Sequence, residues 1–574
     1  MSNFTDKLTA FSRIPVTLVV ITGDFCSRSF GSAPCAATGS YCFNTYSTCR
    51  DPSHYNATTK DYLFSSLDAP LPFPGPRPYV KNVKTLPTEI TDKFTISGRM
   101  GIDMADEPDG DVGIDPYYAS RTSPIPGTFW KKWIARNPNY ENFPVKVYAG
   151  FYGLAQGDFV QRASMLLDNI TIDKTGGCKI ELVDPLQSLD DVDIPPQLDV
   201  KLAADMTVSQ VTLSLMGDDY GSLPTSAFYL MIGDEVVYVG SRSDNQCNNC
   251  LRGQFGSTAS AGSASDKVQL CRYFAPANPY DILQTMLLTD AALDPSLVNT
   301  ASFATVKAFD VNIVPFSTLL TEPTKLKDLF FEIIDLVDCK CWVAEDLTIT
   351  IRKNLQNLPG RVYRELSDAT GIVEGTPSPD LNAASRIDTI YLYWNKSALG
   401  KADDNASYGN IDVFKYDGPY KRVSEKTVQC RWIQDSYINE DLIADYIRRL
   451  GQRMLRLYKD AMPIVSLSVE LKDSDVQTGQ YVHLTSSCLQ NPDGSNLNAR
   501  TAEVVRREEK TATAGLPATV DLNLLVYPAR RICFIQTATS AVPYTQATRA
   551  QKERGFICNT LGQMSNHDPG YTMY

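Results

Sequence analysis

Alternation of apolar and polar residues dominates the middle and later parts of this chain, and it predicts β-strands with one buried face. Three runs of this kind follow one another from Val145, namely VKVYAGFYG, LLDNITID and CKIELVD, and Gly and Asp turns separate them. The pattern returns at 207–215, at 228–239, and at Val465, Leu467, Val469 and Leu471.

Two later segments have the period of an amphipathic helix instead. The first apolar stripe, with Pro323 near its start, is Leu326, Leu329, Phe330, Ile333, Ile334 and Val337. The second is Ile443, Tyr446, Ile447, Leu450, Met454 and Leu457. This second helix also carries Arg448, Arg449, Arg453 and Arg456, which we interpret as a solvated or interface face.

No stretch is long enough to span a membrane, and the longest apolar run is 14–22, IPVTLVVIT. Lys7 and Arg13 before it, and Ala36 and Ala37 after it, give a faint signal-peptide pattern. The run is short and β-branched, so we predict a buried strand. Without export the chain stays in a reducing compartment, which disfavours disulfides.

The composition, with 43% hydrophobic and 21% charged residues, is that of an ordinary folded protein. A chain of 574 residues exceeds one core, and about three to five domains are expected. The net charge of −12 argues against a DNA-binding surface, because phosphate contacts need clustered Lys and Arg. It suits a surface that DNA slides past.

Four cysteines near the start form the strongest chemical signal. Cys26, Cys35, Cys42 and Cys49 have the spacing C-x8-C-x6-C-x6-C, with glycines among them. Four thiolates at turns suit an iron–sulfur cluster or zinc. Disulfides or plain thiols are the alternative, and the ligand chemistry alone leaves these interpretations open.

The other candidate residues favour structural roles. The acidic run GIDMADEPDGDVGID (101–115) lacks the spacing of an EF-hand, so we predict a solvated turn and not a calcium site. Cys247 and Cys250, with Cys271 beyond, lack a second zinc half-site and are predicted to be buried, and Cys339 and Cys341 are predicted to belong to a core.

Catalytic motifs are missing from the sequence. The three histidines are far apart, and the sequence contains no H-E-x-x-H, G-x-S-x-G or P-loop pattern. This lowers the expectation of a hydrolase or a nucleotide enzyme, and the chain is predicted not to be an enzyme.

Two motifs resemble those of phage tail proteins. The spacings C-x8-C and C-x6-C resemble those of lambda-type tail-tip proteins of long-tailed (siphovirus-like) phages, whose small domain holds a [4Fe-4S] cluster. The segment CFNTYSTCRD (42–51) is similar to one in phage tail-tip and gene-transfer-agent hub proteins. The resemblance implies a [4Fe-4S] cluster bound by Cys26, Cys35, Cys42 and Cys49, with zinc as the alternative.

A second resemblance lies at 232–260, where IGDEVVYVG and CLRGQFGSTAS are similar to a β-module of tail proteins. The matching residues are Glu235, Tyr238, Arg252, Gly253, Gly256 and Ser257. The strands from 147 to 189 look like those of baseplate hubs, and the end of the chain, 555–574, is similar to the end of such a protein.

These resemblances imply a structural virion protein, made in the host cytoplasm, that closes the tail tube as a tail-tip (baseplate) hub. They further imply a homotrimer that contacts a distal tail protein and a central tail fibre or tip protein. DNA would pass through its lumen without specific binding. Two other hypotheses are a secreted or surface disulfide-containing binding protein and a tail-associated hydrolase, for which the sequence nominates no residue.

The fold class expected from all of this is mainly β with some α, in several domains. A small cysteine-rich cluster domain would join β-barrel-like hub domains and a few helices. The predicted segments are a cysteine-rich iron–sulfur domain (1–60), a polar connector or β region (61–145), a hub β domain (146–205), an inserted β module with R-G-x-x-G (206–275), an α/β hub domain (276–460), a second hub β domain (461–540) and an extended C-terminal tail (541–574).

Overall fold

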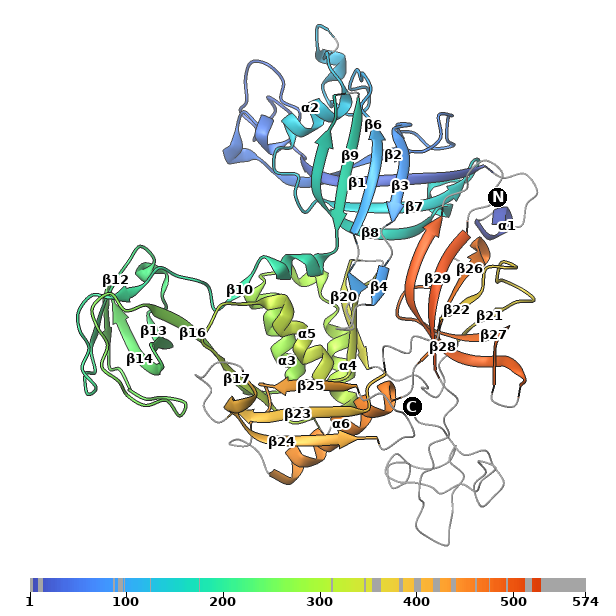
Figure 1. The fold of residues 1–574 in the computed structure, drawn as a ribbon. Helices are drawn as coiled ribbons and strands as arrows, with labels where there is room; N and C mark the ends of the chain where they lie inside the picture. Colours follow the sequence, from blue (N-terminus) through green and yellow to red (C-terminus); the bar gives the residue numbers. More distant parts are fainter. Residues whose placement is uncertain are drawn as a thin grey trace.

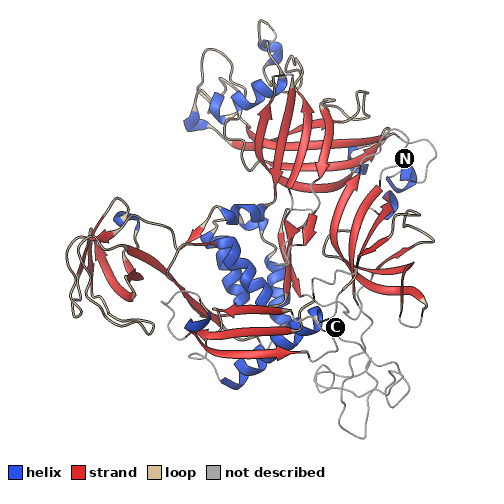
Figure 2. Ribbon diagram, in the orientation of Figure 1, coloured by secondary structure: helices blue, strands red, loops and turns tan. Residues whose placement is uncertain are grey.

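The computed structural model describes most of the chain. The described residues are 4–8, 14–85, 88–90, 96–97, 99–123, 125–174, 176–310, 313–344, 347–353, 363–380, 386–396, 404–416, 424–434, 440–459, 462–473, 475–491, 494–510 and 519–527. They form a mainly β protein with several sheets around separate cores, which confirms the predicted fold class (Figures 1 and 2). The predicted tail, 541–574, lies outside the described residues.

The N-terminal unit is a 7-stranded sheet in the order β2-β1-β7-β8-β9-β6-β3. Its strands are β1 (Pro15–Cys26), β2 (Ala57–Ser65), β3 (Val80–Thr85), β6 (Arg99–Ala105), β7 (Pro144–Phe151), β8 (Val160–Ile172) and β9 (Gly177–Val183). A bridge between Phe64 and Arg77 brings the chain just before β3 against β2, so the sheet curls on itself. Helix α2 (Phe129–Arg136) packs into the same core through Trp130 and Trp133.

Strand β1 is the predicted buried strand, and the prediction is confirmed. Val19 and Ile21 face the main core of the sheet, while Val16, Leu18 and Val20 face a second apolar cluster on the other side. A strand buried on both faces needs apolar residues at successive positions, which explains the continuous apolar run 18–21, LVVI.

Residues from the first three predicted segments pair in this one sheet. β2, β3, β6 and α2 come from 57–136, a stretch that composition marks as a polar connector. Polar residues occupy its loops and many of its strand positions, whereas Tyr62, Phe64, Ile102 and Met104 on its strands are buried. The three runs predicted from Val145 onward are confirmed as β7, β8 and β9.

A second 7-stranded sheet forms a module at one side of the protein (Figure 1). Its strands, in the order β11-β12-β15-β14-β13-β16-β17, are β11 (Lys201–Leu202), β12 (Leu213–Met216), β15 (Gln246–Asn248), β14 (Glu235–Ser243), β13 (Ser226–Ile232), β16 (Val268–Ala277) and β17 (Phe316–Leu320). The long strand β16 leads from this module back into the central body, where it pairs with β17. Residues 207–212, predicted as part of a strand, form a loop before β12.

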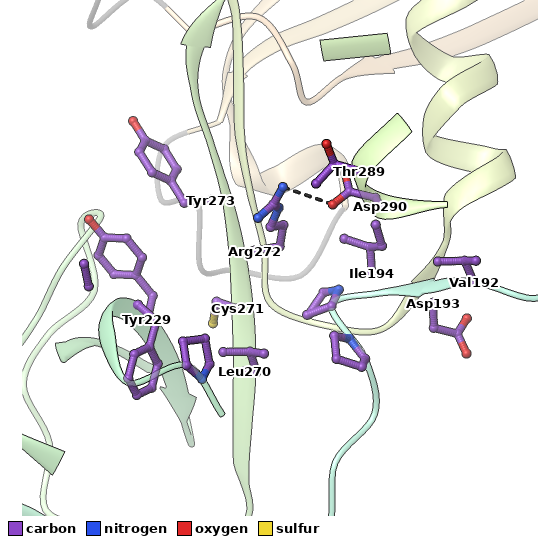
Figure 3. Close-up of a pocket in the computed structure, with 15 residues that line it drawn as sticks. Val192, Asp193, Ile194, Tyr229, Leu270, Cys271, Arg272, Tyr273, Thr289 and Asp290 are labelled. Atoms are coloured by element: carbon purple, nitrogen blue, oxygen red, sulfur yellow. Dashed lines mark hydrogen bonds and ion pairs between the residues drawn. The ribbon is translucent and has the colours of Figure 1, made fainter. Parts of the chain in front are cut away.

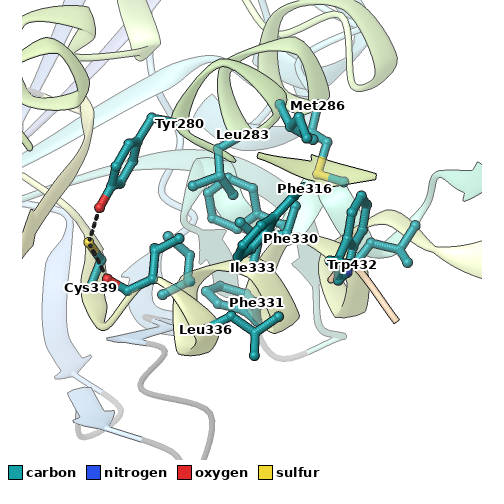
Figure 4. Close-up of a cluster of buried hydrophobic side chains, with 14 of the residues drawn as sticks. Tyr280, Leu283, Met286, Phe316, Phe330, Phe331, Ile333, Leu336, Cys339 and Trp432 are labelled. Carbon is teal, nitrogen blue, oxygen red and sulfur yellow. Dashed lines mark hydrogen bonds between the residues drawn. The ribbon is translucent and has the colours of Figure 1, made fainter. Parts of the chain in front are cut away.

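The central body contains the largest apolar core (Figure 4). Its elements are α3 (Pro279–Thr285), α4 (Thr300–Phe309), α5 (Leu326–Leu336), the hairpin β19 (Cys339–Val343) and β20 (Ile349–Lys353), the sheet β23 (Thr389–Lys396), β24 (Tyr408–Lys415) and β25 (Glu425–Cys430), and α6 (Glu440–Tyr458). Phe316, Phe330, Phe331 and Trp432 meet in this core.

Both predicted helices are confirmed. The stripe from Leu326 to Ile334 is buried on α5, and Val337 is buried just after its end. On α6, the predicted residues up to Met454 are buried, while the side chain of Leu457 lies outside the described ones. Arg448 and Arg449 are exposed and pair with Asp445, as expected for a solvated face. No helix in the described part of the chain is long and apolar enough to cross a membrane.

The C-terminal unit is an 8-stranded sheet. Its strands are β21 (Arg364–Ser367), β22 (Ser378–Asp380), β26 (Ile464–Glu470), β27 (Tyr481–Gln490), β28 (Asn496–Lys510) and β29 (Thr519–Val526), with β4 (Thr88–Ile90) and β5 (Ile96–Ser97) from the N-terminal part of the chain. The predicted alternating strand is β26, on which Val465, Leu467 and Val469 are buried. The pairing of β4 with β28 ties the two ends of the described chain together.

A buried ion pair joins the central body to the C-terminal sheet. Lys340 on β19 pairs with Glu503 on β28, and their side chains are only 1% and 2% exposed. Glu503 also accepts a hydrogen bond from the hydroxyl of Tyr527 at 2.5 Å. Burying charges costs free energy, so this pair serves to fix one relative position of the two units.

We therefore expect Lys340→Met to destabilise the protein by about 3–5 kcal/mol, because it leaves the carboxylate of Glu503 buried without a cation. The double variant Lys340→Met with Glu503→Gln should recover much of this loss. Urea unfolding followed by tryptophan fluorescence measures both. Lys201→Met, which breaks the exposed pair with Asp199, is the matched control and should change stability by less than about 1 kcal/mol. A double variant as unstable as Lys340→Met would contradict this account.

Candidate functional site

The four N-terminal cysteines line a single pocket. Cys26 is the last residue of β1, and the other three lie in the long connection to β2, near the short turns Tyr46–Thr48 and Pro52–His54. The remaining lining residues are Arg28, Phe30, Ala37, Asn44, Arg50, Asp51, His54 and Tyr55. Strand β1 therefore places the Cys26 thiol in the pocket, and the loop after it places the other three thiols in the same pocket.

Asn44 holds the two sides of this pocket together. Its side-chain amide donates to the carbonyls of Cys26 and Arg28 at 2.9 and 3.1 Å, and its oxygen accepts from the Cys42 thiol at 3.3 Å. The backbone N–H of Arg28 points at the Cys26 sulfur at 3.4 Å. Burial raises the pKa of the Cys42 thiol, and the neighbouring thiols of Cys49 and Cys35 raise it further. A cation in the pocket would reverse this effect.

Aromatic and cationic side chains contact the cysteine loop and hold it in place. The ring of Phe43 lies between two guanidinium groups, with Arg121 at 4.1 Å and Arg136 at 3.8 Å from its centroid. Arg121 also donates to the Cys42 carbonyl at 2.9 Å. The hydroxyl of Tyr117 accepts from the backbone N–H of Phe30 at 2.7 Å. These contacts fix the loop on both sides of Cys35 and Cys42.

The acidic run supplies the opposite charges for these cations, so the prediction of a solvated turn was wrong. Asp111 is buried and pairs with Lys132 at 3.0 Å and Arg136 at 2.7 Å. Asp115 is buried and pairs with Arg121. The carboxylates are engaged by side chains of the same unit, and the cations within thirty residues after the run were the signal that the sequence offered.

Two more of the six carboxylates of this run are also engaged. Asp109 pairs with Arg77 at 2.6 Å, and Asp106 accepts from the Trp130 N–H at 2.9 Å and from the Thr128 hydroxyl at 2.7 Å at the start of α2. The guanidinium of Arg77 helps to hold the pKa of Asp109 below its usual range, against the opposing effect of burial. This segment is a buried scaffold beneath the cysteine loop.

Asp51 closes the loop on the opposite side. Its carboxylate accepts from the backbone N–H of Ala36 at 2.8 Å, from the Ser53 hydroxyl at 2.8 Å and from His54 Nδ1 at 2.9 Å. These hydrogen bonds, that of Ala36 first, lower the pKa of Asp51 to about 2. His54 is thereby held at the edge of the cysteine pocket.

The donor set fits a soft metal group. Four thiols with backbone and cationic neighbours are the ligands that zinc and iron–sulfur clusters prefer. Among the described side chains, no three Cys, His, Asp or Glu residues gather closely enough to hold one metal ion. The thiols instead stand around the walls of a shared pocket.

The remaining cysteines singled out in the sequence are buried among apolar side chains, as predicted. Cys247 and Cys250 belong to the core of the module, and Cys271 lies between its sheet and the central body. Burial raises the pKa of Cys247 to about 12 and that of Cys250 to about 11. Cys339 and Cys341 lie in the central core, which confirms their predicted role.

The R-G-x-x-G motif builds a loop around one buried ion pair. Arg252 and Glu235 are joined by two parallel contacts of 2.7 and 2.6 Å. The Glu235 carboxylate also accepts the backbone N–H groups of Gly253 and Ser260, each at 2.9 Å. Arg252 donates further to the Ser260 carbonyl at 2.6 Å. Every strong acceptor position of this carboxylate is therefore used within the fold.

Local contacts and backbone conformation also explain why glycines and a serine stand at their positions in this motif. Gly253 and Gly256 have φ of 60° and 77°, which favours glycine, and a Cβ on Gly253 would lie 3.1 Å from the Ser257 carbonyl oxygen. The Ser257 hydroxyl accepts from the Val236 N–H at 2.9 Å and donates to the Gln254 carbonyl at 2.7 Å. The motif is structural.

A second pocket lies where the module meets the central body (Figure 3). Arg272 on β16 pairs with Asp290 at 3.0 Å, and Ile194, Tyr229 and Leu270 line the same space. Burial raises the pKa of Asp290, and the neighbouring Arg272 opposes this. Sequence reasoning missed this site, because neither residue stands in a recognisable motif.

We expect Glu235→Gln to loosen the loop 251–262, because the neutral amide loses the charge-assisted acceptors for Arg252, Gly253 and Ser260. Hydrogen exchange should show at least tenfold less protection of the Gly253 and Ser260 amides, with β8 and β9 unchanged. Glu181→Gln, which breaks an exposed pair with Lys179, is the control. Unchanged protection at both amides would contradict the structural role of the motif.

The Asp51 contacts predict a pH dependence for the cysteine loop. A carboxyl group whose folded pKa is lowered to about 2 stabilises the fold above its unfolded pKa of 3.8, and this contribution is lost as the pH falls from there towards 2. The amide resonance of Ala36, observed by NMR with ¹⁵N-alanine labelling, should titrate near the lower value. A midpoint near the unfolded value would show that these hydrogen bonds do not form.

No protein-family model matches this chain, and no curated protein matches it. Among solved structures it is similar to a tail protein from Neisseria meningitidis, with 9% identity and a TM-score of 0.39 over 78% of this chain and 92% of that one. It is also similar to the 43 kDa tail protein of prophage MuSo2 from Shewanella oneidensis, with 8% identity and a TM-score of 0.38 over 78% and 93% of the two chains. A third is the prophage tail protein gp18 from Listeria monocytogenes, with 11% identity and a TM-score of 0.34 over 77% and 87%. These scores are low, and an assignment of function depends on this chain's own residues.

Proposed function

We propose that this chain is a structural protein of a phage-like virion, located at the tail tip. It would act as a baseplate hub whose N-terminal loop is stapled by a [4Fe-4S] cluster on Cys26, Cys35, Cys42 and Cys49. The observation that carries the proposal is that all four thiols line one pocket. The loop that holds them has C-x8-C and C-x6-C spacings that resemble those of tail-tip proteins, and its CFNTYSTCRD segment is similar to one in tail-tip and hub proteins.

The loop needs such a staple because it has almost no core of its own. Residues 27–56 are all described, contain no strand, and bury one apolar side chain, that of Ala37. Fixing each backbone residue costs about 1–2 kcal/mol of conformational entropy, and hydrophobic burial offsets little of that here. Four metal–thiolate ligands would supply the missing free energy, as metals do in other small loop-rich domains.

The spacing of the thiols supports a cluster over zinc. Four thiolates on one zinc ion have sulfurs about 3.8 Å apart, because each Zn–S bond is about 2.3 Å long. No three of the described Cys, His, Asp or Glu side chains gather in this way, although all four thiols line one pocket. In a cluster each cysteine binds a different iron, so its sulfurs stand further apart. The nearby Arg28 and Arg50 would offset the negative charge of the thiolates.

When bound, the cluster would supply covalent cross-links, and the chain's own residues do the rest. Asn44 donates to the carbonyls of Cys26 and Arg28, Asp51 fixes the backbone at Ala36, and Arg121 and Arg136 pack against Phe43. These contacts hold the thiols around the pocket. The role we propose is structural, without catalysis.

The rest of the chain supports a role in assembly. Two curled β-sheet units flank a helical body, and Ile411 and Val413 present an apolar face on β24, where they are 49% and 52% exposed. We propose a homotrimer that contacts a distal tail protein above and a central fibre or tip protein below. The net charge of −12 suits a lumen through which DNA passes without binding.

Cys35→Ser tests the cluster and its structural role together. Protein purified without oxygen should be brown, contain iron and sulfide, and absorb broadly near ~400 nm, and the variant should lose all three and become protease-sensitive between residues 20 and 55. Cys488→Ser, at a half-buried thiol on β27, is the matched control and should change none of them. A colourless wild-type protein that contains zinc would show that the bound metal is zinc and not a cluster. A protein with neither metal would overturn the proposed cofactor.

The same variant tests the assignment to the tail tip. In virions that carry an epitope-tagged chain, gold-labelled antibody should mark the end of the tail, and Cys35→Ser should reduce the yield of complete tails. Label elsewhere on the particle would overturn the location. If the variant assembles complete tails and keeps wild-type protease resistance, the proposed structural role of the cluster is overturned.

A further inference from the structure

Tyr55 carries a polar atom that the folded chain leaves without a partner. Its side chain lines the pocket of the four cysteines, and its hydroxyl oxygen is buried and makes no hydrogen bond. Leaving a buried hydroxyl unsatisfied costs about 1–3 kcal/mol, so such an atom calls for an explanation. Its place in the cysteine pocket supplies one.

The ring of Tyr55 is held in this place. It packs edge-on against the ring of Tyr46, with 5.1 Å between centroids and an interplanar angle of 86°. Its backbone N–H donates to the Pro52 carbonyl at 3.2 Å. The next residue, Asn56, is tied to Ser27, beside Cys26, by a backbone hydrogen bond of 3.0 Å and a side-chain contact of 2.6 Å. The hydroxyl is therefore positioned by both ends of the loop.

The other polar groups of the pocket are engaged elsewhere. The carboxylate of Asp51 accepts from Ala36, Ser53 and His54, and the side-chain oxygen of Asn44 accepts from Cys42. Arg28 and Arg50 carry donor side chains only. With Cys42 bound as a thiolate, the side-chain acceptors open to a hydroxyl donor in this pocket are the four sulfurs, the Asn44 oxygen and Nε2 of His54. The sulfurs are the most numerous of these and carry the negative charge of the site.

We infer that the Tyr55 hydroxyl donates an O–H···S hydrogen bond to the sulfur set held by the four cysteines, and so tunes the reduction potential of the bound cluster. This inference rests on the proposed [4Fe-4S] cluster. Tyr55 is a positioning residue and not a ligand. Hydrogen bonds to the sulfurs are one of the levers that set the potential of a cluster, because they stabilise the extra negative charge of the reduced state.

Tyr55→Phe keeps the ring and removes the donor. The variant should retain the wild-type content of iron and sulfide. Its reduction equilibrium should shift about tenfold towards the oxidised state, so its reduction potential should be about 59 mV lower for a one-electron couple. Tyr46→Phe is the matched control, because it removes a hydroxyl from the partner ring, whose residue is 61% exposed and lies outside the pocket lining. Its potential should equal that of the wild type.

The experiment uses the full chain, purified without oxygen, with iron and sulfide content measured first and the potential then measured by spectroelectrochemistry. A wild-type protein without iron and sulfide overturns the proposed cluster. A loaded Tyr55→Phe protein with the wild-type potential overturns the hydrogen bond alone. If Tyr55→Phe does not fold, the wild-type chain can be made with 3-fluorotyrosine, whose hydroxyl is a stronger donor. Its reduction potential should then be higher than that of the unlabelled protein, and an unchanged potential overturns the inference.

Discussion

The shortage of apolar residues between β1 and β2 is the constraint on which the site depends. A connection of this length cannot be ordered by hydrophobic burial when Ala37 is the one apolar side chain it buries. Part of its ordering comes from contacts with the neighbouring segment of the same unit, where the buried carboxylates Asp111 and Asp115 hold Arg136 and Arg121 against Phe43. The thiols are thus presented by electrostatics and cation–π contacts.

Buried charges recur where separate segments of this chain meet. Asp111 joins the acidic loop to α2, Glu235 joins two strands and a loop of the module, and Lys340 with Glu503 joins the central body to the C-terminal sheet. Such pairs add little net stability, because desolvation offsets their attraction. They do penalise any arrangement that leaves one charge unpaired. We infer that they fix the geometry of the units relative to one another.

The elements that the sequence predicts are those whose burial is local and periodic. β1, β7, β8 and β9, and the helices α5 and α6, follow from the spacing of their apolar residues, since one buried face leaves a regular trace. The prediction for the acidic run 101–115 was wrong because two of its cations, Lys132 and Arg136, reach Asp111 from α2, and the spacing of charges does not show which helix will pack against a loop. The same limit explains the pocket at Arg272 and Asp290, which combines β16 with a residue beyond α3. Pairing between distant segments leaves no period in a sequence.

Two motifs of this chain resemble those of tail proteins, and their contacts in the structure show that they differ in value as evidence for function. The polar groups of Glu235, Arg252 and Ser257 all find partners within the module, so this motif needs no ligand. The cysteines are different. As thiols, Cys26, Cys35, Cys42 and Cys49 line a pocket without bonding one another, and the hydroxyl of Tyr55 is buried beside them without a partner. Buried polar atoms without partners call for an explanation, and this is why the function that we propose depends on the cysteines and not on the glycine motif.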